Sequence, residues 1–353
     1  MYKKDSKRRS CVPTLVSAGF IALDVVLDQH VPGIQRVYAG GTCGNVTTIL
    51  SHFGWRTLPI GRLDRDAAGE RVVRDMKKWD VDTKYLSLYP RAATPVVIEN
   101  LRYRKSGDSY HRFAWTCPSC GVWLPSYRPV TNKSVLELKE TLPKADVFFF
   151  DRVSRSSIEL AKYYRKRGAW IVFEPSGTGS QRLFREALLY CHVLKYSNER
   201  MSELSGLSGT NRPLIQVETL GSEGLRYRLQ NEGRRGTGWN RLRSILKEQP
   251  VDAVGAGDWC TAGFLEQLLK GVPTPDSHIE AGLVGHALEH GQALSAWSCQ
   301  FVGARGGMYE SSDQEIESLG CDTAYECEPS QVRPVGRRRR GTALHCLSAA
   351  CNG

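Results

Sequence analysis

The 353-residue sequence has no apolar run that approaches the roughly 20 residues needed to cross a bilayer. Residues 1–10 are basic, but the apolar core and cleavage site of a signal peptide do not follow them. No internal repeat is apparent either. These absences argue against a membrane partner and against export, so we expect a cytoplasmic protein.

Motifs for nucleic-acid binding are also missing, although the formal net charge is +11. The sequence contains no zinc-finger array, no RRM-like aromatic motif and no sustained basic helix. Most of the excess charge lies in residues 13–310, and a basic core suits anionic small molecules such as nucleotides. We therefore do not expect nucleic acid as a partner.

Metal-like cysteine spacing occurs once among the 11 scattered cysteines, at Cys117-Pro-Ser-Cys120. An odd cysteine count with several members in apolar contexts is typical of reduced thiols in a cytosolic protein. The Cys117–Cys120 pair resembles half of a zinc knuckle, whereas a structural zinc site needs four ligands. His111 could be a third ligand of Zn²⁺, and a second subunit could supply the rest. The alternative is that this pair binds no metal.

Strand-like and helix-like segments alternate along the chain, with glycine-rich turns after several strands. This pattern predicts an α/β fold with a mostly parallel central sheet and helices on both faces. Two strand-like segments, Pro95–Leu101 and Ser109–Trp115, have no crossover helix between them and predict a small antiparallel lid. The predicted divisions are a basic tail (1–12), the α/β domain (13–310, lid at about 93–130) and a disordered tail (311–353).

The stretch Asp252-Ala-Val-Gly255-Ala256-Gly257-Asp258 carries the clearest chemistry. Its two glycines allow a tight turn, and the apolar spacing after Asp258 predicts a helix. A glycine-rich loop that opens a helix presents N–H groups to an anion, most often phosphate. Asp258 makes sense there if it takes a proton from a hydroxyl that then attacks phosphorus. The alternative is an ordinary turn with an N-capping Asp.

Two further turns and one carboxylate are candidate ligand contacts. Asp24 follows the first predicted strand, Thr14–Gly19, at the end where ligands bind in open α/β sheets, although a surface turn is an equal alternative. Gly40-Gly41-Thr-Cys-Gly-Asn45 opens a predicted helix; its double glycine lets a ligand approach the backbone, while Asn45 could simply be an N-cap. Thr219-Leu-Gly221-Ser222-Glu-Gly224 is another glycine-rich turn, at the end of a predicted strand.

These stretches coincide, in order, with the motifs of one family. Together with the Gly61–Gly69 loop, they make the chain similar to the PfkB (ribokinase-like) family of carbohydrate kinases over about Pro13–Met308. The resemblance implies a three-layer sandwich with a mostly parallel central sheet and a small antiparallel β lid. It also implies phosphorylation of a sugar hydroxyl with ATP and Mg²⁺ as cofactors, and a homodimer formed through the lid.

The resemblance further implies a role for each matching position. Asp258 is the expected catalytic base, and the expected anion hole is Gly255, Ala256 and Gly257. The expected substrate-binding residues are Asp24, Gly40, Gly41 and Asn45. The expected ATP-binding residues are Asn198, Thr219, Gly221, Ser222 and Gly224. Asp252 is expected at a monovalent cation.

One position departs from the family pattern. Family members commonly carry Asn-x-x-Glu, which helps to organise magnesium and phosphate, but this sequence has Asn198-Glu199-Arg200-Met201. A thioether is a poor ligand for a hard cation, so Glu199 or Glu203 would have to substitute with a different geometry. Two alternatives to a sugar kinase stay open: a nucleoside kinase of the same fold, and a non-catalytic binding or scaffold protein.

Overall fold

A mostly parallel sheet forms the centre of the computed structural model, which describes residues 12–31, 33–201, 213–230, 238–246 and 249–312. Within these residues nine strands form the large sheet, in the order β13-β12-β11-β10-β9-β8-β1-β4-β5. Pairing is antiparallel at β11–β12 and β12–β13 and parallel elsewhere. The strands are β1 (Thr14–Ala18), β4 (Arg56–Asp64), β5 (Leu86–Tyr89), β8 (Val147–Phe150), β9 (Trp170–Phe173), β10 (Val193–Ser197), β11 (Ile215–Thr219), β12 (Leu225–Leu229) and β13 (Asn240–Leu242).

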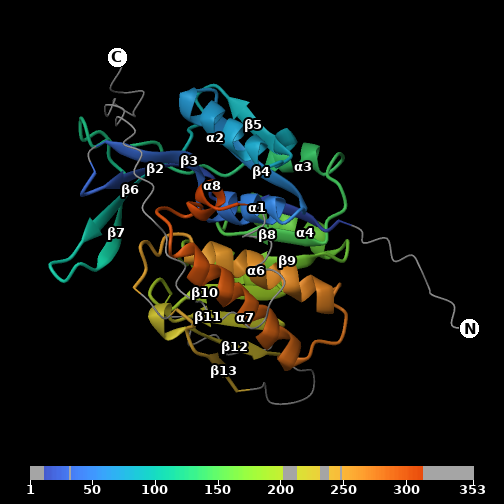
Figure 1. The fold of residues 1–353 in the computed structure, drawn as a ribbon. Coiled ribbons are helices and arrows are strands. Elements are labelled where there is room, and N and C mark those ends of the chain that lie inside the picture. Colours follow the sequence, from blue (N-terminus) through green and yellow to red (C-terminus); the bar gives the residue numbers. More distant parts are fainter. Residues whose placement is uncertain (1–11, 32, 202–212, 231–237, 247–248, 313–353) are drawn as a thin grey trace, which may run out of the picture.

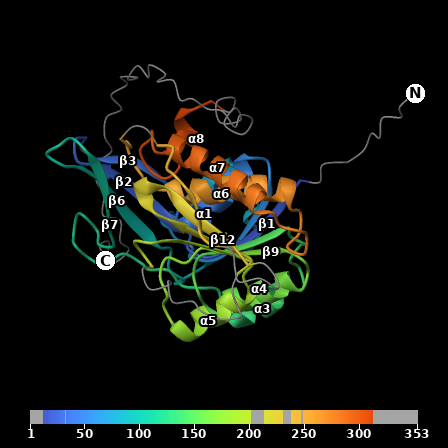
Figure 2. The same cartoon turned by 90° about the horizontal axis from the view of Figure 1, so that it is seen from below.

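Helices cover both faces of this sheet, as the sequence predicts. Figure 2 shows α3, α4 and α5 on one side of the strands, and α1, α6 and α7 on the other. The helices are α1 (Thr42–His52), α2 (Ala67–Lys78), α3 (Asn132–Leu138), α4 (Arg155–Arg165), α5 (Gln181–Tyr190), α6 (Ala256–Gly271), α7 (Ala281–Ser298) and α8 (Gly307–Glu310).

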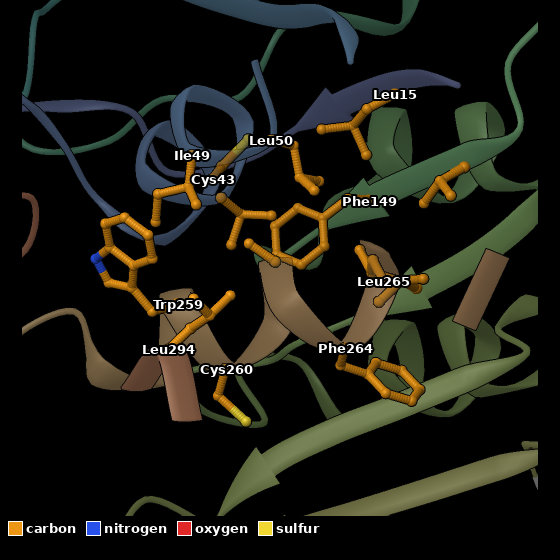
Figure 3. Packing of buried hydrophobic residues seen from close by; sticks show 14 of the residues in the cluster. Leu15, Cys43, Ile49, Leu50, Phe149, Trp259, Cys260, Phe264, Leu265 and Leu294 are labelled. Carbon is orange, nitrogen blue, oxygen red and sulfur yellow. The ribbon is translucent and has the colours of Figure 1, made fainter. Parts of the chain in front are cut away.

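Each central strand supplies side chains to two apolar cores, because successive strand residues point to opposite faces. Phe149 of β8 belongs to the core under α1 and α6, whereas its neighbours Phe148 and Phe150 belong to the core under α4 and α5. Figure 3 shows Phe149 between Leu50 of α1 and Leu265 of α6. This double burial explains why the strands are continuous apolar runs in the sequence.

Close packing of α6 against α7 depends on two glycines. A Cβ at Gly291 would lie 2.5 Å from the carbonyl oxygen of Cys260, and a Cβ at Gly263 would lie 3.0 Å from the Cα of Gly291. The alanine- and glycine-rich composition of this region therefore brings two helix backbones together. Through this contact α7 supports α6, which begins at the predicted anion hole.

A second, four-stranded sheet forms the lid, at one side of the large sheet (Figure 1). Its strands are β3 (Ile34–Gly40), β2 (Ala22–Asp28), β6 (Val96–Tyr103) and β7 (Ser109–Ala114), in that order. The predicted segment 93–130 supplies only β6 and β7. The other two strands come from residues before α1, so the lid sheet has two strands more than the sequence predicts.

Some local predictions need correction. The Gly61–Gly69 segment is not all loop, because β4 continues to Asp64 and α2 begins at Ala67. The tails predicted at 1–12 and 311–353 lie almost wholly outside the described residues, as does Glu203, so the predicted division into tails and domain stays a prediction. No helix in the described part of the chain is long and apolar enough to cross a membrane.

Candidate active site

The turn before α6 has the geometry that the sequence predicts for an anion hole. Gly255 is the N-cap of α6, with a φ of 78°, and a Cβ there would lie 2.6 Å from the Cα of Ala304. Only glycine fits both the left-handed backbone and this contact. The first turn of a helix leaves N–H groups without intrahelical acceptors, although the N–H of Ala256 donates to the carbonyl of Ala253 over 3.3 Å.

Asp258 lies inside the first turn of α6, so it is not the N-capping residue of an ordinary turn. The side-chain Nδ2 of Asn45 donates to its Oδ2 over 2.7 Å, which joins two motifs separated by more than half of the chain. Burial raises the pKa of Asp258 to about 7; the nearby Glu174 carboxylate raises it further, and the Asn45 hydrogen bond lowers it. A carboxylate with such a pKa can accept a proton near neutral pH.

Asn45 reaches Asp258 from the first turn of α1. Gly41, with a φ of 77°, is the N-cap of this helix, and the Asn45 N–H closes its first hydrogen bond to the Gly41 carbonyl. The sequence alternative that Asn45 is itself the N-cap is therefore wrong. Its amide is oriented from the other side by Arg305, whose Nε donates to Oδ1 over 3.3 Å. This donation leaves Nδ2 facing Asp258.

Asp24 lies within β2 of the lid rather than in a turn after β1, and its carboxylate contacts the double-glycine segment. The Gly41 N–H donates to its Oδ2 over 3.3 Å, and a Cβ at Gly40 would lie 1.7 Å from that oxygen. Gly40 is thus required by the close approach of Asp24. Burial raises the pKa of Asp24 to about 7, against the lowering effects of the Gly41 N–H and Arg305.

Arg305 is a fully buried cation that fastens the lid strand β3 to two helices. Besides Asn45, its guanidinium donates to the carbonyl of Ala39 and to Oδ2 of Asp75 in α2. The Asp75 carboxylate also accepts the N–H of Ala39 over 2.9 Å. Arg305 thus pairs its charge with Asp75 while it holds the position of Asn45, although its Nη1 has no hydrogen-bond partner among the described residues and its charge still lowers the pKa of Asp24.

A buried ion pair contacts the backbone of the predicted anion hole. Lys195 of β10, only 2% exposed, donates to Oε1 of Glu174 over 2.6 Å and to the carbonyl of Gly257 over 3.0 Å. Thr261 of α6 donates to Oε2 of Glu174 over 2.5 Å. A Cβ at Gly257 would lie 3.7 Å from the Lys195 ammonium, so this positive charge lies directly beside the turn.

The Thr219–Gly224 segment forms the predicted glycine-rich turn at the end of β11. Gly221 and Gly224 have φ values of 59° and 99°, and a Cβ at Gly224 would lie 2.3 Å from the carbonyl oxygen of Leu242. The turn is tied to the end of β10, because the Asn198 N–H donates to the Thr219 carbonyl over 3.0 Å. The structure therefore brings Asn198 and the turn together.

Met201 belongs to the apolar core under α4 and α5, so its side chain is not a substitute ligand for the Glu of the family pattern. Glu199 lies closer to the glycine-rich turn: its Oε1 is 3.6 Å from the position of a Cβ on Gly221. The side-chain Oδ1 of Asn198 is buried and lacks a hydrogen-bond partner in the described part of the chain. Two oxygen ligands suitable for magnesium thus remain beside the turn.

Asp252 is buried where the lid meets the large domain. Its Oδ1 accepts the N–H of Val254 over 3.1 Å, and its Oδ2 accepts the N–H of Gly303 over 2.8 Å. His111 of β7 approaches Oδ1 to 3.9 Å, and Glu99 of β6 is a second buried carboxyl group nearby. Burial raises the pKa of Glu99 well above its usual range, and the charges of Asp252 and Asp24 raise it further.

The structure does not assemble a zinc site from the residues that it describes. No three His, Cys, Asp or Glu side chains among them are grouped as metal ligands. His111, the possible third ligand, instead lies beside Asp252. Cys120 is disulfide-bonded, so zinc at Cys117 and Cys120 would require reduction of Cys120 as well as ligands from outside the described residues, and it stays a prediction.

Several site residues were missed in the sequence, and they share one signal. Glu99 and Lys195 are charged residues in the middle of apolar strand patterns, Val96–Leu101 and Val193–Ser197. A charge at such a position is expensive unless it is paired or functional. Arg305 carried no comparable signal, because its region has no regular periodicity.

Comparison with known proteins supports one family. The model of the pfkB family carbohydrate kinases matches residues 18–310. A search of curated proteins finds no match. Among solved structures, the chain is similar to a ribokinase of Arabidopsis thaliana complexed with ribose and ATP, with 17% identity and a TM-score of 0.63, over 89% of this chain and 100% of that one.

Two other solved structures have the same fold. A nucleoside kinase of Burkholderia thailandensis in complex with inosine shows 14% identity and a TM-score of 0.61, over 86% of this chain and 96% of that chain. A fructokinase of Xylella fastidiosa with bound ATP shows 16% identity and a TM-score of 0.63, over 87% of this chain and 97% of that chain. At such identities the likeness establishes the fold.

Proposed function

The chain belongs to the pfkB family of carbohydrate kinases, and on this premise we propose that it transfers the terminal phosphoryl group of ATP to a hydroxyl of a sugar or sugar-like alcohol. The observation that carries the proposal is the 2.7 Å contact between Asn45 and Asp258 at the start of α6. It places a carboxylate of raised pKa beside a glycine turn that can bind a phosphoryl group.

In this proposal Asp258 accepts the proton of the acceptor hydroxyl, whose oxygen then attacks the phosphorus in line. Asn45 holds the Asp258 carboxylate in place, and Asp24 with the N–H groups of Gly40 and Gly41 positions the substrate. The N–H groups at Gly255–Gly257 stabilise the charge that develops on the phosphoryl oxygens. The ammonium of Lys195 adds a fixed positive charge beside Gly257.

The nucleotide binds, we propose, against the Thr219–Gly224 turn with Asn198. Two of the structural neighbours have ATP bound, which supports nucleotide binding by this chain. Asn198 and Glu199 would hold magnesium, since both oxygens lie beside the turn; when bound, the ion neutralises phosphate charge. Met201 is not one of the proposed magnesium ligands.

Three further expectations are kept as proposals. Each Asp252 carboxylate oxygen retains a lone pair beyond its backbone hydrogen bond, which is compatible with a monovalent cation. Exposed apolar residues on the lid segment, including Trp123 at 74% exposure, fit a homodimer formed through the lid. A zinc ion at Cys117 and Cys120 would belong to the same segment.

One observation favours a nucleoside as the acceptor. Phe20, next to the Gly41 turn, has its ring centroid 6.4 Å from Trp115 and 6.1 Å from Tyr127, and the guanidinium of Arg152 lies 4.6 Å above its ring. Aromatic side chains of this kind can stack on a base. A nucleoside kinase is therefore our second candidate.

The proposal is tested by ADP release from purified protein with ATP, magnesium and a panel of pentoses, hexoses and nucleosides. Asp258→Asn should lower kcat about a hundred- to ten-thousandfold, as expected for loss of a general base. Asp276→Asn is the matched control, because Asp276 is exposed in the loop at the far end of α6 and should leave kcat unchanged.

Turnover that survives in Asp258→Asn would exclude Asp258 as the base. If no acceptor is phosphorylated although ATP and a sugar bind, the protein is a binding or scaffold protein on a kinase fold instead. The panel also separates the two kinase candidates, since it measures sugars and nucleosides side by side.

A further inference from the structure

The inner face of the lid carries a row of polar side chains that the proposed chemistry does not use fully. Asp24 in β2 lies directly opposite Tyr38 in β3, and Glu99 in β6 pairs with Val26, two residues beyond Asp24. Because side chains alternate along a strand, Asp24, Tyr38 and Glu99 share one face of the lid. This face is turned toward the substrate site: Asp24 contacts Gly41, and the Tyr38 hydroxyl lies against Gly303.

These three side chains are buried, yet four of their polar atoms have no hydrogen-bond partner in the part of the chain that the structure describes. The atoms are Oδ1 of Asp24, the hydroxyl of Tyr38, and Oε1 and Oε2 of Glu99, whose carboxyl group interacts with another carboxyl group, that of Asp252. Their residues are 6%, 2% and 0% exposed. A buried polar group without a partner is costly, and folded proteins rarely keep one that serves no ligand.

Acidic groups also outnumber basic groups in this row. Three carboxyl groups converge here, those of Asp24, Glu99 and Asp252. The buried cation nearby, Arg305, is engaged by Asp75 and has its guanidinium over the Tyr38 ring. His111 approaches only Asp252. A neutral sugar hydroxyl would supply hydrogen bonds to this row but no positive charge, which these carboxyl groups need in order to ionise.

We propose that the lid end of the pocket binds a protonated amino group, so that the preferred acceptor is an amino sugar. An ammonium group supplies three hydrogen-bond donors and one positive charge, which matches the unpartnered oxygens of Glu99 and Asp24. Tyr38 completes the row as a hydroxyl that can accept from the same group. Glu99 is then a specificity-determining residue of the acceptor site. This inference rests on the proposed kinase function, because it takes the Asp24 region as the acceptor pocket.

A metal ion is a less suitable occupant than an amine. No three carboxylate, imidazole or thiol side chains are grouped as metal ligands within the described residues. Two of the oxygens in the row belong to Asp24 and Asp252 and already accept backbone N–H groups. The open positions therefore lie on the lid side, at Glu99 and Oδ1 of Asp24.

The experiment measures binding by calorimetry, with the probes glucosamine, galactosamine, mannosamine and kanosamine, each beside its parent hexose and at a pH where the amine is protonated. At least one amino sugar should bind about ten- to a hundredfold more tightly than its parent, the usual size of a charged hydrogen bond. Glu99→Gln should remove this preference, so that an amino sugar and its parent hexose bind with about equal affinity. Glu140→Gln, an exposed carboxylate in the turn before β8, should keep it.

The stability of the free protein gives a second readout. The raised pKa keeps Glu99 uncharged in the free protein near neutral pH, and glutamine has nearly the same shape, so Glu99→Gln should change Tm little while it lowers affinity for the amine; a merely structural role for Glu99 would instead lower Tm. Equal affinity for every amino sugar and its parent would overturn the proposal. So would a potassium ion that occupies the row alone and is lost in Glu99→Gln.

The two proposals fail in different ways. If amino sugars bind preferentially but no ADP is released, the kinase proposal is wrong and the amine site stands. If parent hexoses are phosphorylated as efficiently as amino sugars, the kinase proposal stands and the amine site is wrong. The wild-type comparison decides this without any variant, so a poorly folding Glu99→Gln protein does not leave the question open.

Discussion

The two ends of the candidate site differ in how their buried polar groups are paired. At the base end, Asn45 donates to Asp258, and the Lys195–Glu174 pair is tied to Gly257. At the lid end, Glu99 and Tyr38 are just as buried but have no hydrogen-bond partner within the described residues. The protein thus satisfies one set of polar groups by itself and leaves the other set to a ligand.

In the proposed function, the base end carries out the reaction and the lid end recognises the substrate. The groups that must meet a developing charge are held in place before any substrate binds, which avoids reorganisation during the reaction. The groups on the lid carry a cost in the free protein that a suitable substrate would remove. Predictions about the two ends therefore differ: changes at the base end should destabilise the protein, whereas Glu99→Gln should change its stability little and remove its preference for the amine.

The largest effect on stability is expected from Lys195→Met. It leaves Glu174 as an uncompensated carboxylate beside Asp258, and loss of one partner of a buried ion pair typically costs about 3–5 kcal/mol. Urea unfolding measures the free energy of unfolding. Lys270→Met is the matched control: Lys270 is 57% exposed in its pair with Glu266, so its loss should cost no more than about 0.5 kcal/mol.

The double variant Lys195→Met/Glu174→Gln sharpens this test. It removes both charges, so it should recover much of the lost stability. Equal stability of Lys195→Met and the wild type would show that the pair is not a structural support. Activity should fall in both variants, because both lack the positive charge beside Gly257.

A smaller effect on stability is expected from Gly255→Ala. A residue with a Cβ costs about 1–2 kcal/mol in the left-handed conformation, and here the Cβ would also contact Ala304. Displacement of the anion-hole N–H groups should lower kcat about a hundred- to a thousandfold. Gly282→Ala in α7 is the control: nothing lies near its Cβ, so it should stabilise the helix by about 0.5–1 kcal/mol. Unchanged kcat in Gly255→Ala would contradict the anion-hole assignment.

The smallest expected effect concerns pH. Asp258 must be ionised to act as a base, and its pKa is raised to about 7, so kcat should fall as pH drops below about 7. The Asn45 hydrogen bond lowers this pKa, so Asn45→Ala should shift the kcat profile to higher pH. A kcat profile that is flat from about pH 5 to about pH 8 would contradict the assignment.

The same raised pKa has a consequence for stability. The folded protein binds the Asp258 proton more tightly than the unfolded chain, whose carboxyl has a pKa of 3.8. This group therefore lowers the free energy of unfolding as pH rises from about 4 to about 7. Asp24, also raised to about 7 by burial, acts in the same direction. Asp258→Asn should reduce this pH dependence.

Much of the fold could be predicted because local patterns and tertiary structure agree. The apolar runs at Val147–Phe150 and Trp170–Phe173 are buried on both faces, which is typical of strands in a parallel sheet that helices cover on both sides. The lid strands β2 and β3 were harder to place, because β2 pairs with the distant β6, with Leu23 beside Val96, and β3 joins the lid only through β2. Pairing across such a distance is set by the assembled sheet rather than by the segment itself.

The candidate site was predictable to the extent that backbone requirements show in the sequence. The glycines at 40, 41 and 255 mark close approaches or positive φ values that a residue with a side chain does not readily satisfy. The partners of those turns were not predictable. That Arg305 orients Asn45, or that Lys195 lies beside Gly257, follows only from how distant elements pack.

The connection between the lid and the helix that carries Asn45 is very short. Strand β3 ends at Gly40 and α1 begins at Thr42, so a single residue, Gly41, lies between them. Arg305 fastens both sides of this joint, to the Ala39 carbonyl and to Asn45. Any displacement of β3 would therefore be expected to shift the Asn45 amide that contacts Asp258. A ligand that moves the lid should then also change the surroundings of Asp258.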